Sequence, residues 1–106
     1  MPSWCSATLI DVDFMETELK GVKFAAYMCG AILIRVGFQH ATLNDVMFNC
    51  TTLEKVSFIV AKMDAKNEIM YFGNAKCVDC NFLLAHVTGM LNVQGARFAP
   101  IDVPKR

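Results

Sequence analysis

The chain has 106 residues, of which 55% are hydrophobic and 19% are charged, and its ten basic and ten acidic residues cancel. This length is typical of a single domain, here residues 1–106, and the apolar content excludes a disordered chain. Because the net charge is zero, there is neither the basic footprint of a nucleic-acid-binding protein nor an acidic tail, and we expect no direct binding of nucleic acid.

The sequence also argues against a membrane or secreted protein. Its longest apolar stretch, residues 24–34, is shorter than the roughly 20 residues with which a helix spans a bilayer. No basic segment followed by an apolar run occurs at the N-terminus, so no signal peptide is evident. The five cysteines, an odd number, favour reduced thiols over a closed disulfide framework. We therefore expect a cytoplasmic protein that does not contact a membrane.

A repeat of five residues runs through most of the chain. Each unit begins with a small residue and has a large apolar residue two positions later, as in Ala7-Thr8-Leu9 and Val12-Asp13-Phe14. Units start at residues 7, 12, 17 and 22 and, after one four-residue step, at 26, 31, 36, 41, 46, 51, 56 and 61. Alternate residues of a strand share a face, so the small and large residues of a unit point the same way. A helical period of 3.6 does not keep residues five apart on one face.

This register resembles that of the pentapeptide-repeat proteins, whose motif is a small residue, a polar residue, Leu or Phe, and two loosely specified positions. The resemblance covers nearly the whole chain. It implies an all-β fold with little or no helix, a right-handed parallel quadrilateral β-helix in which four units form one square coil. Each coil buries its apolar residues only against neighbouring coils, spaced about 4.8 Å apart. With 21 units, the chain would form about five coils.

The predicted core consists of the large inward residues of successive units. These are Leu9, Phe14, Leu19, Phe24, Met28, Leu33, Phe38, Leu43, Phe48, Leu53, Phe58, Met63, Phe72, Phe82 and Phe98. At roughly 1.5–3 kcal/mol for each large side chain buried, this interior can stabilise a domain without helices. In this register the two short units, which start at residues 22 and 61, lie on the same side of the square.

The register is ambiguous between residues 61 and 75. A four-residue unit that ends at Asp64 restores the register and places Asn67 at a large apolar position, where an unpaired amide costs about 1–3 kcal/mol. Either the Asn67 amide bonds to exposed backbone, or residues 66–68 bulge out as a loop, which we favour. Beyond this segment the units start at residues 75, 80, 85, 91, 96 and 101, with one six-residue unit that contains Gly89.

No pattern typical of a catalytic or metal site fits this register. Cys77-Val78-Asp79-Cys80 has the spacing of a CxxC motif, but both cysteines take inward positions, so we interpret them as core thiols. Cys29 and Cys50 lie outside on one predicted side, one coil apart, and no disulfide is expected between them in the cytoplasm. His40 and His86 fall on different sides and are interpreted as solvated. We expect a protein that is not an enzyme and has no metal or cofactor.

Exposed apolar residues are the candidates for a partner surface, because clusters of them form interfaces. The register groups them as Met15 with Ile32 and Ile34, Ile59 and Val60 with Val78, and Leu83 with Leu84. The partner would be an unknown protein or a second copy of the chain. Four acidic residues of the first coil form either a solvated rim, which we favour, or an acidic patch that faces a partner: Asp11, Asp13, Glu16 and Glu18.

The ends of an open β-helix expose unpaired backbone and apolar core. Pro2, Trp4, Pro100 and Pro104 are placed to blunt these ends, because proline cannot extend a ladder of backbone hydrogen bonds. Otherwise the ends pair between molecules and give a homo-oligomer, or the chain is a piece of a longer rod.

For function we expect a non-enzymatic structural or protein-interaction module. The resemblance supplies an alternative, since some pentapeptide-repeat proteins imitate duplex DNA and bind DNA gyrase, which gives resistance to quinolones or toxins. The neutral charge disfavours this alternative, because basic residues such as Lys23, Arg35 and Lys62 interrupt any acidic face. A repeat segment of a secreted bacterial effector is a weaker third reading.

Overall fold

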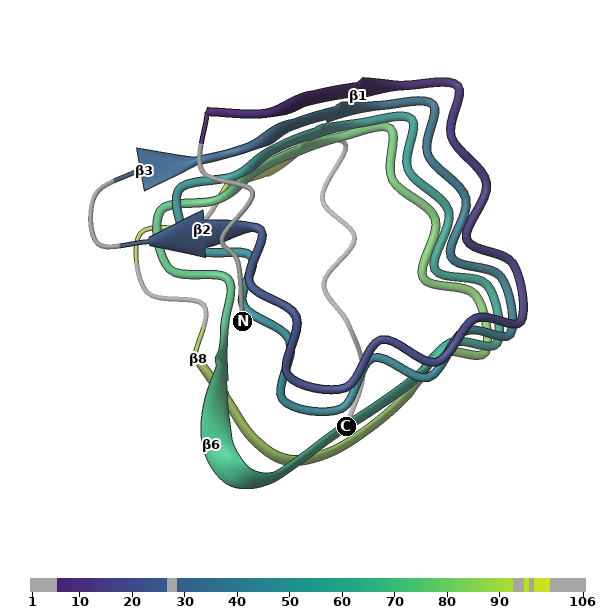
Figure 1. Ribbon diagram of the computed structural model, residues 1–106, viewed down its shortest axis with the longest axis vertical. Helices are drawn as coiled ribbons and strands as arrows, with labels where there is room; N and C mark the ends of the chain where they lie inside the picture. Colours follow the sequence, from purple (N-terminus) through teal and green to yellow (C-terminus); the bar gives the residue numbers. More distant parts are fainter. Residues whose placement is uncertain (1–5, 27–28, 93–94, 96, 100–106) are drawn as a thin grey trace.

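Each five-residue unit forms a short extended segment followed by a corner, and four units return the chain to its starting side. The computed structural model describes residues 6–26, 29–92, 95 and 97–99. Viewed down the axis, the coils lie almost on top of one another, and the chain turns clockwise as it recedes from the viewer (Figure 1). The described residues contain no helix. The all-β, right-handed, four-sided parallel β-helix implied by the resemblance is therefore confirmed.

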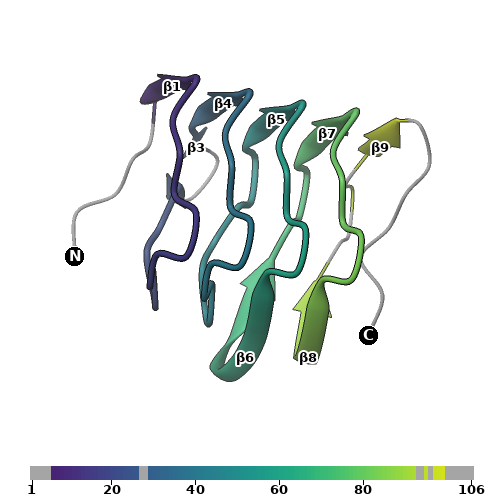
Figure 2. The same cartoon turned by 90° about the vertical axis from the view of Figure 1, so that its right-hand side faces the viewer.

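Side 1 of the coil, where the described chain begins, is the most regular. Its five parallel strands are stacked in the order in which the chain visits them (Figure 2): β1 (Thr8–Ile10), β4 (Ile32–Ile34), β5 (Thr52–Glu54), β7 (Lys76–Val78) and β9 (Arg97–Ala99). The register places Leu9, Leu33, Leu53 and Cys77 above one another. Five visits to side 1 agree with the expected five coils, which we number 1 to 5 from the N-terminus.

Sides 2, 3 and 4 follow in chain order and are linked between coils by single parallel bridges. On side 2 the bridges join Asp13, Gly37, Ser57 and Asn81; on side 3 they join Glu18, Thr42 and Lys62; on side 4 they join Lys23 and Met47. Backbone hydrogen bonds run along the coil axis at these bridges, as from Phe38 N to the Ser57 carbonyl at 2.8 Å. The backbone polar groups of one coil are thus satisfied by the next.

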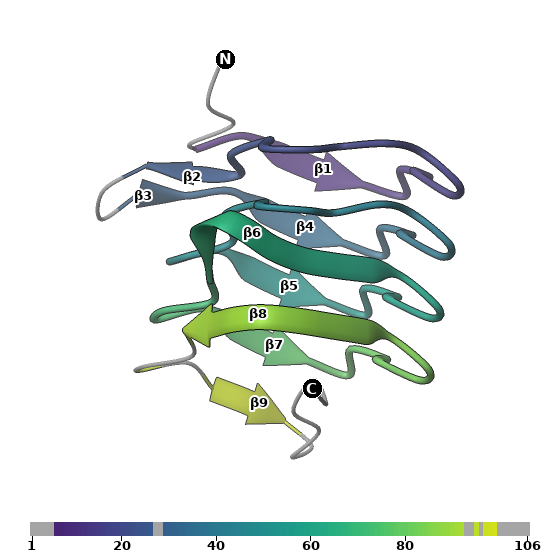
Figure 3. The ribbon, with the colours of Figure 1, turned by 90° about the horizontal axis from the view of Figure 1, so that it is seen from below.

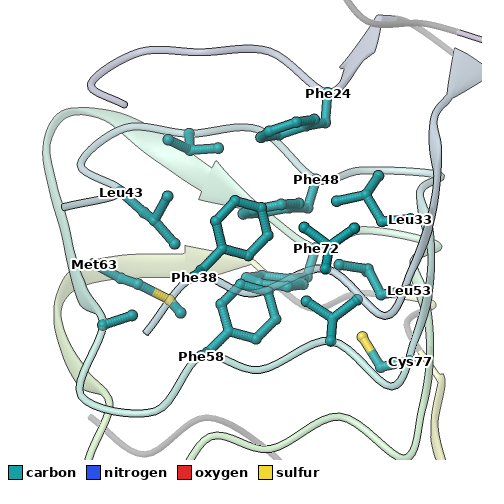
Figure 4. Packing of buried hydrophobic residues seen from close by; sticks show 14 of the residues in the cluster. Phe24, Leu33, Phe38, Leu43, Phe48, Leu53, Phe58, Met63, Phe72 and Cys77 are labelled. Carbon is teal, nitrogen blue, oxygen red and sulfur yellow. The ribbon is translucent and has the colours of Figure 1, made fainter. Parts of the chain in front are cut away.

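Two columns of phenylalanine rings fill the interior (Figure 4). Phe14, Phe38, Phe58 and Phe82 stack along side 2 with ring centroids 4.8–5.4 Å apart, and Phe24, Phe48 and Phe72 stack along side 4 at 5.1–5.2 Å. The two columns meet edge to face at 5.6–6.4 Å. Both geometries are favourable for aromatic pairs. The aliphatic residues of sides 1 and 3, such as Leu33 and Leu43, close the interior between them.

The predicted core is confirmed wherever its side chains are described. Phe24 and the later members up to Phe82 are buried, most of them completely. Leu9, Phe14 and Leu19 are only half-buried, because coil 1 has a described neighbouring coil on one side only. Met28 and the side chain of Phe98 lie outside the described residues.

The predicted unit at residues 26–30 is wrong. Residues 25–30 instead contain an antiparallel hairpin of β2 (Ala25–Ala26) and β3 (Cys29–Gly30), which projects from the corner between sides 4 and 1 (Figure 1). Ala31 N donates to the Phe24 carbonyl at 2.9 Å, just as Thr51 N donates to Phe48 one coil later. The hairpin is therefore an insertion into a corner turn that leaves both flanking columns in register. As a result, the units that start at residues 22 and 61 do not share a side.

The ambiguous segment forms a bulged strand. Strand β6 (Lys62–Tyr71) pairs in parallel with β8 (His86–Asn92), and the register shifts between Ala65, opposite Gly89, and Met70, opposite Leu91. Both strands bow outward at the corner between sides 3 and 4 (Figures 1 and 3). The predicted bulge is confirmed, and the side chain of Asn67 lies outside the described set.

Truncation of a ring in the middle of a column should strongly destabilise the fold. We expect Phe48→Ala to lower the free energy of unfolding by about 3–5 kcal/mol, because Phe48 is fully buried and stacks on Phe24 and Phe72. Phe14→Ala, at the half-buried end of the other column, is the control and should cost clearly less. Urea unfolding followed by circular dichroism measures both. Equal losses would contradict the column model.

The corner next to the hairpin requires a glycine. A Cβ on Gly30 would overlap the carbonyl group of Cys50 and the backbone N of Thr51, which cannot move aside as a flexible side chain does. We expect Gly30→Ala to destabilise the protein by about 1–3 kcal/mol. In the control, Gly21→Ala, the new methyl group meets nothing within 4 Å, so only the positive φ of 69° contributes, about 1 kcal/mol. Thermal unfolding that ranks Gly21→Ala as the worse variant would disprove this packing argument.

Candidate protein-interaction surface

Every described regular corner places one residue in the left-handed region of backbone conformation. These residues precede the small inward residue of the next unit and have φ between 52° and 74°. This conformation costs L-residues roughly 1–2 kcal/mol, and glycine, asparagine and aspartate tolerate it best. Most corners accordingly have polar residues or glycine at this position, such as Asp11, Asp45 and Gly21.

Two corners depart from this preference with large aliphatic residues. Val60 has φ of 56° and Leu84 has φ of 57°. A β-branched residue in this conformation is an outlier, because its branched Cβ crowds the backbone. Val60 and Leu84 occupy the same corner, between sides 2 and 3, in consecutive coils, where Val60 N donates to the carbonyl of Leu83 at 3.0 Å.

We call this corner the corner stack. It consists of one pair of residues per coil: Met15 and Glu16, Gln39 and His40, Ile59 and Val60, Leu83 and Leu84. Hydrogen bonds from Glu16 N to Gln39 O at 2.9 Å and from His40 N to Ile59 O at 3.1 Å align the pairs along the axis. Leu83 and Leu84 of coil 4 are the most exposed apolar residues of this stack, at 60% and 73%, against 48% for Met15 and 36% for Val60. The part of the corner stack in coils 3 and 4, which we call the lower corner stack, is therefore an apolar ridge formed by Ile59, Val60, Leu83 and Leu84.

Polar side chains border this ridge on both sides. Ser57 and Asn81 lie above one another on side 2, and Lys62 and His86 on side 3. The Asn81 carboxamide also fixes the ridge locally, because its Oδ1 accepts a hydrogen bond from Leu83 N at 2.9 Å. An apolar centre with a polar rim is the usual anatomy of a protein-binding surface.

A second set of exposed apolar residues lies on the outer face of side 1. Ile32 and Ile34 pair with Thr8 and Ile10 in coil 1 and with Thr52 and Glu54 in coil 3, and Val78 follows Glu54. Threonine, glutamate and lysine interrupt this set in the later coils, so it is an apolar spot rather than a continuous ridge.

The structure regroups the sequence-predicted surface residues. Two of the predicted groups are wrong. Ile32, Ile34 and Val78 lie on side 1, away from the residues with which they were grouped. Met15, Ile59 and Val60 belong instead to the corner stack, together with Leu83 and Leu84. Two errors in the register are the cause: the hairpin was counted as a unit, which shifted Met15 by one side, and the bulged segment 61–74 was counted as three units although it covers two sides, which shifted Val78. Ile10, 48% exposed, was missed for the same reason.

A shallow hollow of about 360 Å³ lies on side 2, next to the part of the corner stack in coils 1 and 2. Gly37, which has no side chain, forms its floor between Asp13 and Ser57, and Arg35, Lys55 and Met15 border it. Gln39 folds over Gly37 from the corner stack, where its Oε1 is buried without a hydrogen-bond partner among the described residues.

Two ion pairs lie on the exposed surface of coils 1 and 2, one of them at the border of the hollow. Arg35 donates two hydrogen bonds to the Asp11 carboxylate, at 2.6 and 3.1 Å, and Lys20 forms an ion pair with Glu18 at 2.9 Å. The hydrogen bond from Arg35 lowers the pKa of Asp11, and the same bond raises the pKa of Arg35. Both groups are solvent-exposed, so the pair contributes little stability. The four acidic residues of coil 1 are all exposed, which both a solvated rim and a partner-facing acidic patch require.

Apart from Cys77 and Cys80, which flank one corner, the groups considered for chemistry are dispersed over the coil. Cys77 is buried as predicted, Cys80 is only half-buried, and His40 and His86 are exposed at different positions of the coil. Cys29 lies in the hairpin rather than on a flat side beside Cys50, and its side chain is outside the described set. Within the described residues, no three His, Cys, Asp or Glu side chains are grouped to bind a metal. Helices long and apolar enough to cross a membrane are likewise missing from the described part of the chain.

Comparison with known proteins adds to this description at the level of the fold. By sequence, the chain matches no protein-family model and no curated protein. Among solved structures it is similar to the pentapeptide repeat protein Rfr23 from the cyanobacterium Cyanothece 51142, with 12% identity over 91% of this chain and 89% of that chain and a TM-score of 0.39.

Two further structures are similar over most of this chain. HetL, a pentapeptide repeat protein involved in heterocyst differentiation regulation in Nostoc sp. strain PCC 7120, is 12% identical over 90% of this chain and 54% of that chain, with a TM-score of 0.31. QnrB1, a plasmid-mediated fluoroquinolone resistance protein, is 11% identical over 92% of this chain and 72% of that chain, with a TM-score of 0.26. At these values the likeness carries no argument about function.

Replacement of the strained valine in the corner stack should stabilise the protein. We expect Val60→Asn to raise the free energy of unfolding by about 0.5–1 kcal/mol, because asparagine adopts positive φ more readily than a β-branched residue. Ile59→Asn is the matched control, since Ile59 is the neighbouring corner residue but does not have a positive φ. Chemical unfolding would contradict the strain argument if Val60→Asn were neutral or destabilising.

Proposed function

We propose that this chain, a pentapeptide-repeat β-helix, is a non-enzymatic module that binds a partner protein through the lower corner stack, Ile59, Val60, Leu83 and Leu84. The observation that carries this proposal is the placement of Val60 and Leu84. The two corners of the described chain that have aliphatic residues in the left-handed conformation are stacked on one edge of the coil. Asparagine or glycine would suit the fold better there, so the residues present serve something other than folding.

The shape of the surface indicates what kind of partner fits. A corner of a square coil is a convex edge, so a partner must provide an apolar groove parallel to the coil axis. Two such ridges bury little area against each other, which favours a different protein over a second copy of the chain. Because Ser57, Asn81, Lys62 and His86 border this surface and Lys62 is the one ionic side chain among them, the contact would depend on apolar burial more than on charge.

Imitation of DNA receives no support from the described surface. A mimic of duplex DNA requires a continuous acidic face, whereas Asp11 is paired with Arg35, Glu18 is paired with Lys20, and Lys55 borders the hollow. The chain also measures 28 × 28 × 26 Å, which is a short block rather than an extended rod.

If the lower corner stack binds a partner, substitutions there should lower the affinity for that partner without lowering the stability of the fold. Leu83→Asn combined with Leu84→Asn should weaken binding of the protein captured by the wild-type chain by about tenfold or more, because buried aliphatic anchors dominate such contacts. The same pair of substitutions should leave the fold at least as stable, since asparagine suits the Leu84 corner. Titration calorimetry and urea unfolding measure the two quantities.

The control pair is Ile10→Asn with Ile32→Asn, which alters the exposed apolar spot on side 1 and should leave binding unchanged. Equal loss of affinity in both pairs would assign binding to apolar exposure in general and contradict the proposal. A chain that binds no protein would also contradict it. Self-association that disappears in the Leu83/Leu84 variant, detected by light scattering, would replace the partner with a second copy.

A further inference from the structure

Coil 4 differs from the other coils at two adjacent core positions. The large inward position of side 1 is leucine in coils 1, 2 and 3, at Leu9, Leu33 and Leu53, but is Cys77 in coil 4. The small inward position of side 2 is valine at residues 12, 36 and 56, but is Cys80 in coil 4. Apolar packing alone does not explain this pair of changes, because cysteine fills the leucine position incompletely.

The two thiols converge across one corner of the coil. Cys77 points into the interior beneath Leu53 (Figure 4), and the Sγ atom of Cys80 lies 3.4 Å from the carbonyl oxygen of Leu53 and 3.7 Å from that of Val78. Leu53 lies directly above Cys77 in the strand register, so both sulfur atoms lie next to the same residue of the coil above. Cys77 is 2% exposed, whereas Cys80 is half-buried, so solvent reaches one thiol of the pair and not the other.

The two thiols differ in pKa and in access to solvent. The interaction with the Cys77 thiol lowers the pKa of Cys80, and backbone groups of Val56 and Val78 act in the same direction, against burial and the Asp79 carboxylate. The pKa of Cys77 is raised, first by its interaction with Cys80 and then by burial. Cys80 is also the thiol that solvent reaches, so it is the member that a small disulfide meets first, and Cys77 is the enclosed member.

We propose that Cys77 and Cys80 form a reactive dithiol that exchanges with low-molecular-weight disulfides such as oxidised glutathione. The Cys80 thiolate attacks one sulfur of the small disulfide, forms a mixed disulfide and releases one small thiolate. The Cys77 thiol transfers its proton to that thiolate, and its sulfur then attacks the Cys80 sulfur and displaces the second small thiolate, which takes up the proton that Cys80 had lost. The small disulfide is reduced to two thiols, and the protein gains one disulfide.

Closing this bond must change the packing of coil 4. A disulfide requires an S–S distance of about 2.05 Å, well below the closest approach of two sulfur atoms that are not bonded to each other. Cys77 would therefore turn from the column beneath Leu53 toward the corner. The oxidised form should differ from the reduced form in the near-ultraviolet signal of the neighbouring phenylalanine column, which includes Phe58 and Phe82.

The test uses the full chain with Cys5, Cys29 and Cys50 replaced by serine, so that Cys77 and Cys80 are the remaining thiols. Incubated with oxidised glutathione, this protein should lose two titratable thiols and two hydrogens in mass while it stays folded. With the further change Cys77→Ser, the reaction should stop at one glutathione bound to Cys80. With Cys80→Ser instead, the buried Cys77 should remain unmodified.

Three outcomes would overturn the proposal. One is a folded protein that retains both thiols at every ratio of oxidised to reduced glutathione. Another is a disulfide that forms no more readily in the folded chain than in urea, since the fold then contributes nothing. The last is equal glutathionylation of Cys77 and Cys80 in the single variants. If the triple serine background does not fold, peptide mapping of the alkylated wild-type chain decides among the same outcomes.

Discussion

The structure depends on one constraint, which is that each coil must place its inward residues directly on those of the previous coil. The phenylalanine rings of sides 2 and 4 stack at 4.8–5.4 Å, a spacing close to that of hydrogen-bonded strands. Ring stacking and the backbone hydrogen bonds therefore require the same rise per coil, and neither can shift without the other. Extra residues are accepted only at corners, as the hairpin between Phe24 and Ala31 and the bulge between Ala65 and Met70 illustrate.

Four corners in each coil impose a second constraint on the sequence, because each regular corner requires a residue with positive φ. Most of these positions have polar residues, such as the exposed Asp11 and Asp79, because aspartate adopts this conformation at little cost. The surface of the coil is thus partly determined by backbone geometry. Aliphatic residues at Val60 and Leu84 oppose that preference and remain exposed, so they are the positions at which a demand other than folding is visible.

The sequence predicted the fold class because the five-residue register is unbroken from Ala31 to Ala61, and the structure follows it there residue by residue. It failed at residues 25–30, where Ala26 and Met28 imitate a unit and only pairing in space distinguishes a hairpin from a side of the coil. Because the hairpin was counted as a unit, the predicted register placed Met15 on the wrong side of the coil and separated it from Ile59. The spacing of 24 residues between Asp11 and Arg35, against 20 between Asn44 and Asp64, marks the insertion, but it is evident only once the partners are known.

The proposed dithiol and the proposed binding ridge lie at opposite ends of one short segment. Side 2 of coil 4 begins at Cys80 and continues through Asn81 and Phe82 to the corner at Leu83. Asn81 connects the two ends, since its backbone is bridged to Ser57 and its side chain accepts the hydrogen bond from Leu83 N. Because the segment is extended and held from one side by the coil above, a displacement of Cys80 has few residues over which to relax before it reaches the ridge. Coil 4 is therefore the part of the molecule in which thiol chemistry and partner binding would be coupled by the backbone itself.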